Sequence, residues 1–260
     1  MNAVTLRPAR APSALLMLAE FRALWEAGAT LAVWPVLKLA PRGDGHPVLV
    51  LPGLTSGDSS TLLLRRYLKG RGYDVHGWGQ GRNFGPRAGV EESMVRKLEE
   101  LHAKEGRKVS LVGKSLGGAY ARFLAHRHPK LVRGVVTLGS PFKGSPRSTR
   151  AWRVYEGLSG RSAEDEPRLK LVARTPRVPT TSIFSRSDGI VAWRCSVEST
   201  GRRSENIEVL GSHLGLDTHP AVLYALADRL AQPEGEWKPF KRGMLGPLLF
   251  PNPARGMRAA

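Results

Sequence analysis

The 260 residues of this chain are 41% hydrophobic, and 40 Lys and Arg stand against 22 Asp and Glu, for a formal net charge of +18. This length and composition are typical of one globular domain with a substantial core. They exclude a disordered chain, a collagen and a small disulfide scaffold. The one cysteine, Cys195, cannot form an internal disulfide and excludes zinc ribbons and iron–sulfur clusters. We therefore expect a reducing, cytoplasmic location.

The basic residues are spread along the chain rather than gathered into an arm. A groove for nucleic acid usually interleaves basic side chains with stacking aromatics, and no segment of the sequence has that pattern. The charge therefore predicts no nucleic-acid partner. It leaves attraction to anionic lipid or to an acidic partner open.

Residues 1–45 contain the only segment apolar enough to be considered for work at a membrane. Glu20, Arg22 and Glu26 interrupt it, and the eleven apolar or small residues from Ala27 to Leu37 are fewer than the roughly twenty that span a bilayer. We predict neither a transmembrane helix nor a signal peptide, but an N-terminal segment with an amphipathic helix. The apolar face of that helix either packs on the domain, which we favour, or lies on an anionic membrane surface. Its apolar positions include Leu15, Leu18, Ala19, Trp25 and Ala29.

Short apolar runs alternate with helical patterns throughout residues 46–231. Parallel strands need crossovers of a dozen or so residues, usually helical, so this alternation predicts an α/β fold: a mostly parallel sheet flanked by helices on both faces. The tail, 232–260, is basic and rich in proline, and we expect it to wrap the surface or fray. The predicted strands are 48–51, 73–78, 108–112, 134–138, 180–184 and 206–210, and the predicted helices are 60–70, 91–104, 116–127 and one that begins at Pro220.

A Gly-x-Ser-x-Gly sequence, residues 113–117, lies directly between a predicted strand and a predicted helix. At such a sharp turn the serine backbone is strained and its neighbours must be small, so glycines on both sides leave the Ser115 hydroxyl above the sheet. The N-terminus of the following helix directs its amides toward the same point. Ser115 is therefore the candidate nucleophile, and the alternative is a glycine-rich turn with a capping serine.

A serine nucleophile needs a base and a group that orients this base, in the order Ser, then Asp or Glu, then His. Asp188 fits the acid, because it lies in an Asp-Gly turn straight after the predicted strand 180–184. Of the seven histidines only His213 and His219 follow it. His213 lies in a loop between glycines, whereas His219 directly precedes Pro220 and suits the entry of a helix. We favour Ser115, Asp188 and His213 as a catalytic triad.

An oxyanion hole needs two N–H donors beside the nucleophile. The first is the amide of Leu116, the residue after Ser115. The loop 52–57 follows the first predicted strand, and the amide of Leu54 is placed to be the second donor. The alternative for this loop is a simple Pro-Gly turn.

These features together resemble the α/β-hydrolase superfamily and, within it, bacterial lipase-type and esterase-type members. The resemblance rests on residues 46–53, at the first predicted strand, and on residues 137–145, at the end of the predicted strand 134–138. It also rests on the Gly-x-Ser-x-Gly turn and on the loops of Asp188 and His213. Three departures count against true triacylglycerol lipase activity. They are Pro52 where such lipases carry histidine, Phe142 where their Thr-Gly-Thr-Pro-His segment ends in histidine, and Lys114 where an aromatic residue or histidine often precedes the nucleophile.

The resemblance implies hydrolysis of a small-molecule or lipid ester through an acyl-enzyme, with no metal or other cofactor. Thioester hydrolysis, amide hydrolysis and acyl transfer stay open, and so does the oligomeric state. A further alternative is a non-catalytic protein on the same fold that binds membrane surfaces.

The segment 142–179 is longer than a simple crossover and occupies the place where relatives carry a cap. Trp152 and Tyr155 stand three residues apart on a predicted helix, 148–158. They either roof an apolar acyl pocket or make ordinary core contacts, and the sequence does not favour one over the other.

Overall fold

One sheet of six parallel strands, in the order β2-β1-β3-β4-β5-β6, forms the centre of the computed structural model, which describes residues 9–243 and 246–255. The predicted α/β fold is confirmed. The last strand begins about two residues earlier than predicted, because Ser204 already pairs with Thr180 although its side chain is polar. The strands are β1 (Pro47–Leu51), β2 (Asp74–Gly77), β3 (Val109–Lys114), β4 (Val132–Leu138), β5 (Thr180–Phe184) and β6 (Ser204–Glu208).

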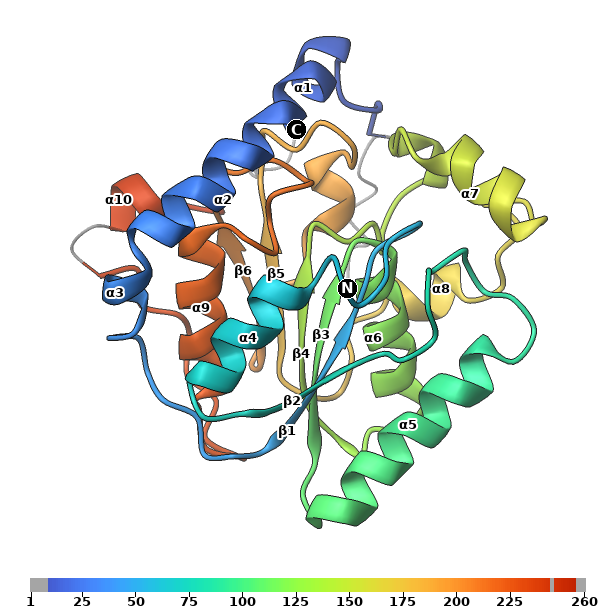
Figure 1. The fold of residues 1–260 in the computed structure, drawn as a ribbon. Coiled ribbons are helices and arrows are strands. Elements are labelled where there is room, and N and C mark those ends of the chain that lie inside the picture. The colour runs from blue at the N-terminus through green and yellow to red at the C-terminus, as the bar shows by residue number, and fades with distance from the viewer. Residues whose placement is uncertain (1–8, 244–245, 256–260) are drawn as a thin grey trace.

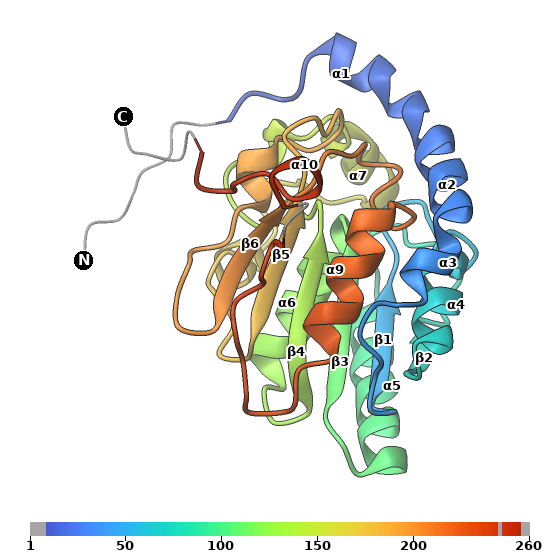
Figure 2. The ribbon, with the colours of Figure 1, turned by 90° about the vertical axis from the view of Figure 1, so that its left-hand side faces the viewer.

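Helices cover both faces of this sheet, as Figures 1 and 2 show. On one face α4 (Leu62–Gly70) and α9 (Pro220–Leu230) pack against one set of strand side chains; on the other, α5 (Val90–Glu105) and α6 (Leu116–Arg127) pack against the opposite set. Because successive side chains of a strand point to opposite faces, β1 contributes valines to the first core and leucines to the second. Because helices bury both faces of the sheet, its strands are continuous apolar runs, and such runs predicted them in the sequence.

The N-terminal segment forms four short helical pieces along one side of the domain (Figure 2). They are α1 (Ala14–Leu18), η1 (Ala19–Arg22), α2 (Ala23–Ala32) and α3 (Trp34–Leu37). The favoured prediction, that the apolar face packs on the domain, is wrong: Leu15 and Trp25 are 76% and 82% exposed, whereas Glu20 is buried. In η1 and α2 polar side chains make the contacts instead, because they find backbone partners in loops of the domain, whereas in α3 the apolar Trp34 and Leu37 pack against the core. No helix within the described residues has the length and hydropathy needed to cross a membrane.

The segment between β4 and β5 contains three short helical pieces, η2 (Pro146–Ser148), α7 (Trp152–Ser159) and α8 (Leu169–Val172). The predicted cap helix therefore begins at Trp152 rather than at 148. A further turn, η3 (Trp193–Ser196), follows β5. In Figure 1 α7 projects beyond the sheet on the same side as α1.

The described part of the proline-rich tail packs on the domain. It contains α10 (Gly246–Leu249), and Phe250 directly after it is 3% exposed. The rings of Phe250 and Phe240 meet edge to face, with centroids 4.8 Å apart. The tail thus extends the core on the α9 side of the sheet.

A buried histidine stands just before β1. His46 is fully buried, its Nε2 lies 2.8 Å from Ser110 Oγ, and its Nδ1 lies 2.5 Å from Asp44 Oδ1. Burial lowers the pKa of His46 to about 4 and outweighs the opposing effect of Asp44. Arg133 and Arg107, which pair with Asp44, lower the pKa of His46 further through their positive charges.

This histidine makes folding stability depend on pH. Unfolded His46 binds a proton below its ordinary pKa of 6.5, whereas folded His46 does so only below about 4. The unfolded state therefore holds more protons in this window, and stability should fall as the pH drops through it, by about 3 kcal/mol in all. Urea unfolding at several pH values should give His46→Gln a shallower fall than wild type. Parallel curves for the two proteins would contradict this assignment.

Candidate active site

Ser115 occupies a strained turn between β3, which ends at Lys114, and α6, which begins at Leu116. Its φ and ψ are 50° and −121°, and among the described residues only Thr55 is another non-glycine with positive φ. Such a conformation persists only where the surroundings enforce it. The Ser115 N–H donates to Leu138 O at 2.8 Å, and the Ser115 carbonyl accepts from the Gly118 N–H at 2.9 Å.

The glycines around Ser115 are required by close backbone contacts. A Cβ at Gly117 would lie 2.2 Å from Leu51 O, and a Cβ at Gly113 would lie 2.3 Å from Gly117 O. Neither neighbour is a flexible side chain that could yield. The Gly-x-Ser-x-Gly pattern therefore lets the first turn of α6 approach β1 and β3 closely, as expected of a nucleophile elbow.

Asp188 and His213 form a buried hydrogen-bonded pair. Asp188 Oδ2 lies 2.7 Å from His213 Nδ1, and the two residues are 3% and 4% exposed. The second carboxylate oxygen, Oδ1, accepts the N–H groups of Ile190 at 2.9 Å and Val191 at 2.7 Å. The loop after β5 thus fixes the carboxylate. A carboxylate on Nδ1 favours the tautomer whose Nε2 is free to accept a proton.

Several contacts bring the serine elbow and the histidine loop to the same edge of the sheet. Lys114 Nζ donates to Leu214 O at 2.8 Å and pairs with Asp217 Oδ1 at 2.5 Å. A Cβ at Gly139 would lie 3.1 Å from His213 Nδ1, and Leu138 before it holds the Ser115 amide. The departure at Lys114 therefore has a structural role as a bridge between the two loops. The hydrogen bonds of the described residues do not include one between Ser115 Oγ and His213.

The two predicted oxyanion donors both line the cavity beside Ser115. Neither the Leu54 nor the Leu116 N–H finds an acceptor among the described residues. The loop of Leu54 lies against the serine, because a Cβ at Gly53 would stand 3.3 Å from Ser115 Cβ. Asn83 holds that loop by donating to Pro52 O at 2.9 Å and accepting from the Thr55 N–H at 2.7 Å.

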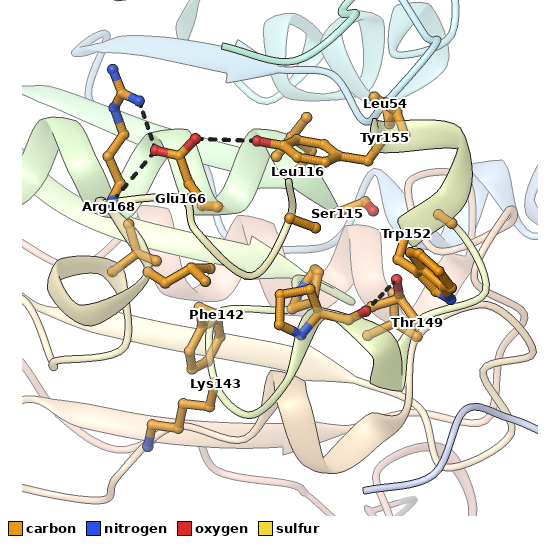
Figure 3. A pocket seen from close by; sticks show the side chains of 18 of the residues that line it. Leu54, Ser115, Leu116, Phe142, Lys143, Thr149, Trp152, Tyr155, Glu166 and Arg168 are labelled. Carbon is orange, nitrogen blue, oxygen red and sulfur yellow. Dashed lines mark hydrogen bonds and ion pairs between the residues drawn. The ribbon is translucent and has the colours of Figure 1, made fainter. Parts of the chain in front are cut away.

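A cavity of about 150 Å³ opens beside Ser115, and most of its lining is apolar. Both Trp152 and Tyr155 of α7 line it, and Figure 3 shows them around the serine. The hydroxyl of Tyr155 donates to Glu166 Oε2 at 3.2 Å, and Arg168 donates to Glu166 Oε1 at 2.7 Å. Of the two alternatives for these aromatic residues, the placement favours the roof of a pocket.

Phe142 stands between this cavity and a buried ion pair. The Arg122 guanidinium lies 3.8 Å from the ring centroid of Phe142 and pairs with Glu198, and all three side chains are almost fully buried. Burial by itself would raise the pKa of Glu198, but the charge and hydrogen bond of Arg122, together with Thr175 and Lys143, outweigh burial and lower that pKa. The phenyl ring that replaces the family's histidine thus covers a charge. Nothing in the sequence pattern could have joined Arg122 to Glu198, because they lie 76 positions apart.

Glu20 is a residue of the site that the sequence pattern did not reveal. Its buried carboxylate accepts the N–H groups of Gly189 at 2.7 Å, His213 at 2.9 Å and Leu214 at 2.8 Å. It therefore joins the loop of Asp188 to the loop of His213. The only signal in the sequence is an acid that interrupts an otherwise apolar helix.

Metal ligands do not gather at this site. Among the described residues no group of three or more His, Cys, Asp or Glu is arranged to hold a metal ion. The arrangement that is present, a serine on a strained turn, a carboxylate–imidazole pair and two N–H groups without acceptors, is suited to acyl chemistry.

The chain belongs to the hydrolase family described as serine aminopeptidase, S33, which matches residues 46–243. The match includes the elbow, Asp188 and His213. Together with the sheet order, it confirms the predicted membership of the α/β-hydrolase superfamily.

Three relatives show how this chain compares with known proteins. A carboxylesterase of Bacillus subtilis (strain 168) is 26% identical over 152 residues, which cover 52% of this chain and 60% of the relative. A triacylglycerol lipase of Burkholderia plantarii is 29% identical over 130 residues, covering 46% of this chain and 36% of the lipase. The crystal structure of Aspergillus fumigatus lipase B superposes with a TM-score of 0.59 at 17% identity, over 72% of this chain and 52% of that one, which shows the fold alone.

Proposed function

We propose that this chain hydrolyses carboxylic esters with Ser115 as nucleophile, His213 as general base and Asp188 as the group that orients the histidine. The observation that carries the proposal is the 2.7 Å pair of Asp188 and His213 at the sheet edge where Ser115 lines an apolar cavity. The names of the two sequence relatives, a carboxylesterase and a lipase, support the same chemistry. A non-catalytic protein would have no need of backbone strain at Ser115.

The reaction follows from the geometry in two halves. His213 Nε2 takes the proton of Ser115 Oγ as this oxygen attacks the ester carbonyl, and the developing oxyanion accepts hydrogen bonds from the Leu54 and Leu116 N–H groups. The protonated histidine then gives its proton to the leaving alkoxide, which departs as an alcohol. Water attacks the acyl-enzyme with His213 again as base, and the acid is released. Asp188 stabilises the imidazolium in both halves.

The lining of the cavity favours an ester with an apolar acyl group. Glu166 is the only acid among the described residues that line it, and it is already bonded to Tyr155 and Arg168. No free carboxylate is therefore offered to the ammonium group of a peptide N-terminus, which favours an ester over an aminopeptidase substrate. A small or lipid ester, rather than a thioester or amide, is the substrate we propose, and a cytoplasmic location, expected from the lone cysteine, is part of the proposal.

Replacement of the nucleophile tests the proposal. Ser115→Ala should lower kcat/KM for p-nitrophenyl butyrate by a factor on the order of 10⁴ or more, because no other hydroxyl stands on the elbow. Ser145→Ala is the matched control, since Ser145 also lines the cavity but caps η2, and it should stay within a few-fold of wild type. Circular dichroism checks that both variants fold. Retention of a tenth of the activity in Ser115→Ala would exclude this serine as nucleophile.

The roof of the cavity should select the acyl chain. Trp152→Ala should lower the ratio of kcat/KM between p-nitrophenyl octanoate and p-nitrophenyl acetate by about tenfold, because a long chain loses an apolar contact that a short one never reaches. Val154→Ala on the same helix is the control, since Val154 is 48% exposed and lies outside the cavity. An unchanged ratio in Trp152→Ala would reject Trp152 as part of the acyl pocket.

A further inference from the structure

The outward face of α1, η1, α2 and α3 is apolar along its whole length. Phe21, Leu24 and Trp25 in its middle are 78%, 79% and 82% exposed. Large exposed apolar patches are unusual on a soluble protein and mark an interaction surface. We call this surface the apolar face; its exposed large side chains are Leu15, Met17, Leu18, Phe21, Leu24, Trp25, Leu31, Val33, Val36 and Leu39.

Of these helices, η1 and α2 hold the domain with their polar side, whereas α3 packs Trp34 and Leu37 against the core. Arg22 donates to Ser187 O at 2.8 Å, Glu26 accepts the Ser212 N–H at 2.8 Å, and the Thr30 hydroxyl donates to Thr218 O. The segment is thus turned opposite to an ordinary surface helix, which buries its apolar side. To bury the apolar face in its own domain, the segment would have to break these bonds. Within the described residues this face is therefore open to a partner.

The charges around the apolar face match an anionic surface. Between Ala9 and Gly43, all described, no acidic side chain is exposed, whereas Arg10, Lys38 and Arg42 are. Arg150 adds an exposed cation beside the start of the segment, since its Nε donates to Pro12 O at 2.8 Å. An interfacial helix binds through buried apolar side chains together with flanking cations that attract anionic headgroups.

We propose that the apolar face docks on an anionic lipid bilayer, with α1 to α3 lying in the plane of the interface. The pieces are too short to span a bilayer, and their aromatic and aliphatic side chains suit the headgroup boundary. Docking itself does not depend on the proposed ester hydrolysis. If that function holds, docking also brings the catalytic edge to a lipid substrate, because α1 and α7 project on the same side of the sheet (Figure 1).

Sedimentation with vesicles tests this docking. The full chain carrying Ser115→Ala, which removes turnover, should bind phosphatidylcholine vesicles with about 30% phosphatidylglycerol at least tenfold more tightly than pure phosphatidylcholine vesicles, and less tightly in high salt. The triple variant Phe21→Ser, Leu24→Ser, Trp25→Ser should lose tenfold or more in binding to the anionic vesicles. Leu248→Ser is the matched control, since Leu248 is 70% exposed on α10, and it should bind as the parent does.

Each other outcome overturns the proposal. Equal binding to both kinds of vesicle would exclude a preference for an anionic surface. Equal binding by the triple variant and its parent would exclude the apolar face as the docking surface. Absence of vesicle binding, with a dimer that the triple variant dissociates in analytical ultracentrifugation, would assign the face to a second copy of the chain. All three substituted side chains are exposed, so loss of the fold is not expected, and circular dichroism verifies it.

A separate observation, the buried carboxylate of Glu20, carries a second inference, which rests on the proposed function. The geometry points to Glu20 as a positioning residue that holds the loops of Asp188 and His213 in register. It accepts one N–H from the first loop and two from the second, including that of His213 itself. It acts through the backbone of these loops, because it bonds to neither the Asp188 carboxylate nor the imidazole.

The variant Glu20→Gln tests this role. A carboxamide has one acceptor oxygen and one N–H₂ donor, so it cannot satisfy three N–H groups that a carboxylate accepts. We expect kcat to fall by about 10- to 100-fold with KM changed less than threefold, because a small displacement of His213 slows chemistry while the cavity stays intact. Glu26→Gln is the control: it loosens the same segment at Ser212 and should keep kcat within threefold.

A merely structural role would give a different result. Glu20→Gln would then melt at a lower temperature but keep the wild-type kcat at temperatures where it is folded, and that result would overturn the inference. Equal loss of kcat in Glu26→Gln would also overturn it, since the effect would belong to the segment as a whole. Activity in wild type and its loss in Ser115→Ala settle the proposed function independently of either outcome.

Discussion

The close approach of α6 to the end of β1 is the constraint on which the site depends. A Cβ at Gly117 would stand 2.2 Å from the carbonyl oxygen of Leu51, so only a glycine allows the helix to begin there. The helix must begin there for Ser115 to adopt its positive φ and for the Leu116 N–H to stay without an acceptor. The other parts of the site, the Leu54 loop and the histidine loop, are then arranged around one fixed point.

Much of this arrangement could be predicted from local sequence, and the reason is physical. Parallel strands buried on both faces must be apolar throughout, so β1 and β3 could be recognised in the sequence. The loops that follow parallel strands meet at one edge of the sheet. The sequence alone therefore predicts that Ser115, Asp188 and His213 lie at a common edge. The curated relatives are matched over 60% or less of their length, so substrate range could not be taken from them.

What the sequence did not reveal depends on partners far apart in the chain. An amphipathic pattern tells which side of a helix is apolar, but not which side faces the protein, and here the buried Glu20 and its neighbours place the polar side against the domain. Likewise Arg122 and Glu198 meet only in the folded state, so Phe142 could be noticed as a departure but not explained. Both cases are buried charges satisfied by distant groups, which leave no periodic signal.

We propose that Ser115 is the reacting group of a preorganised acyl-transfer site. A crystal structure of the chain after reaction with a fluorophosphonate tests it most directly. We predict a covalent bond from Ser115 Oγ to phosphorus, with the phosphonyl oxygen about 3 Å from the Leu54 and Leu116 nitrogens and His213 Nε2 beside the serine oxygen. A phosphonate attached elsewhere, or one whose oxygen points away from both amides, would contradict it.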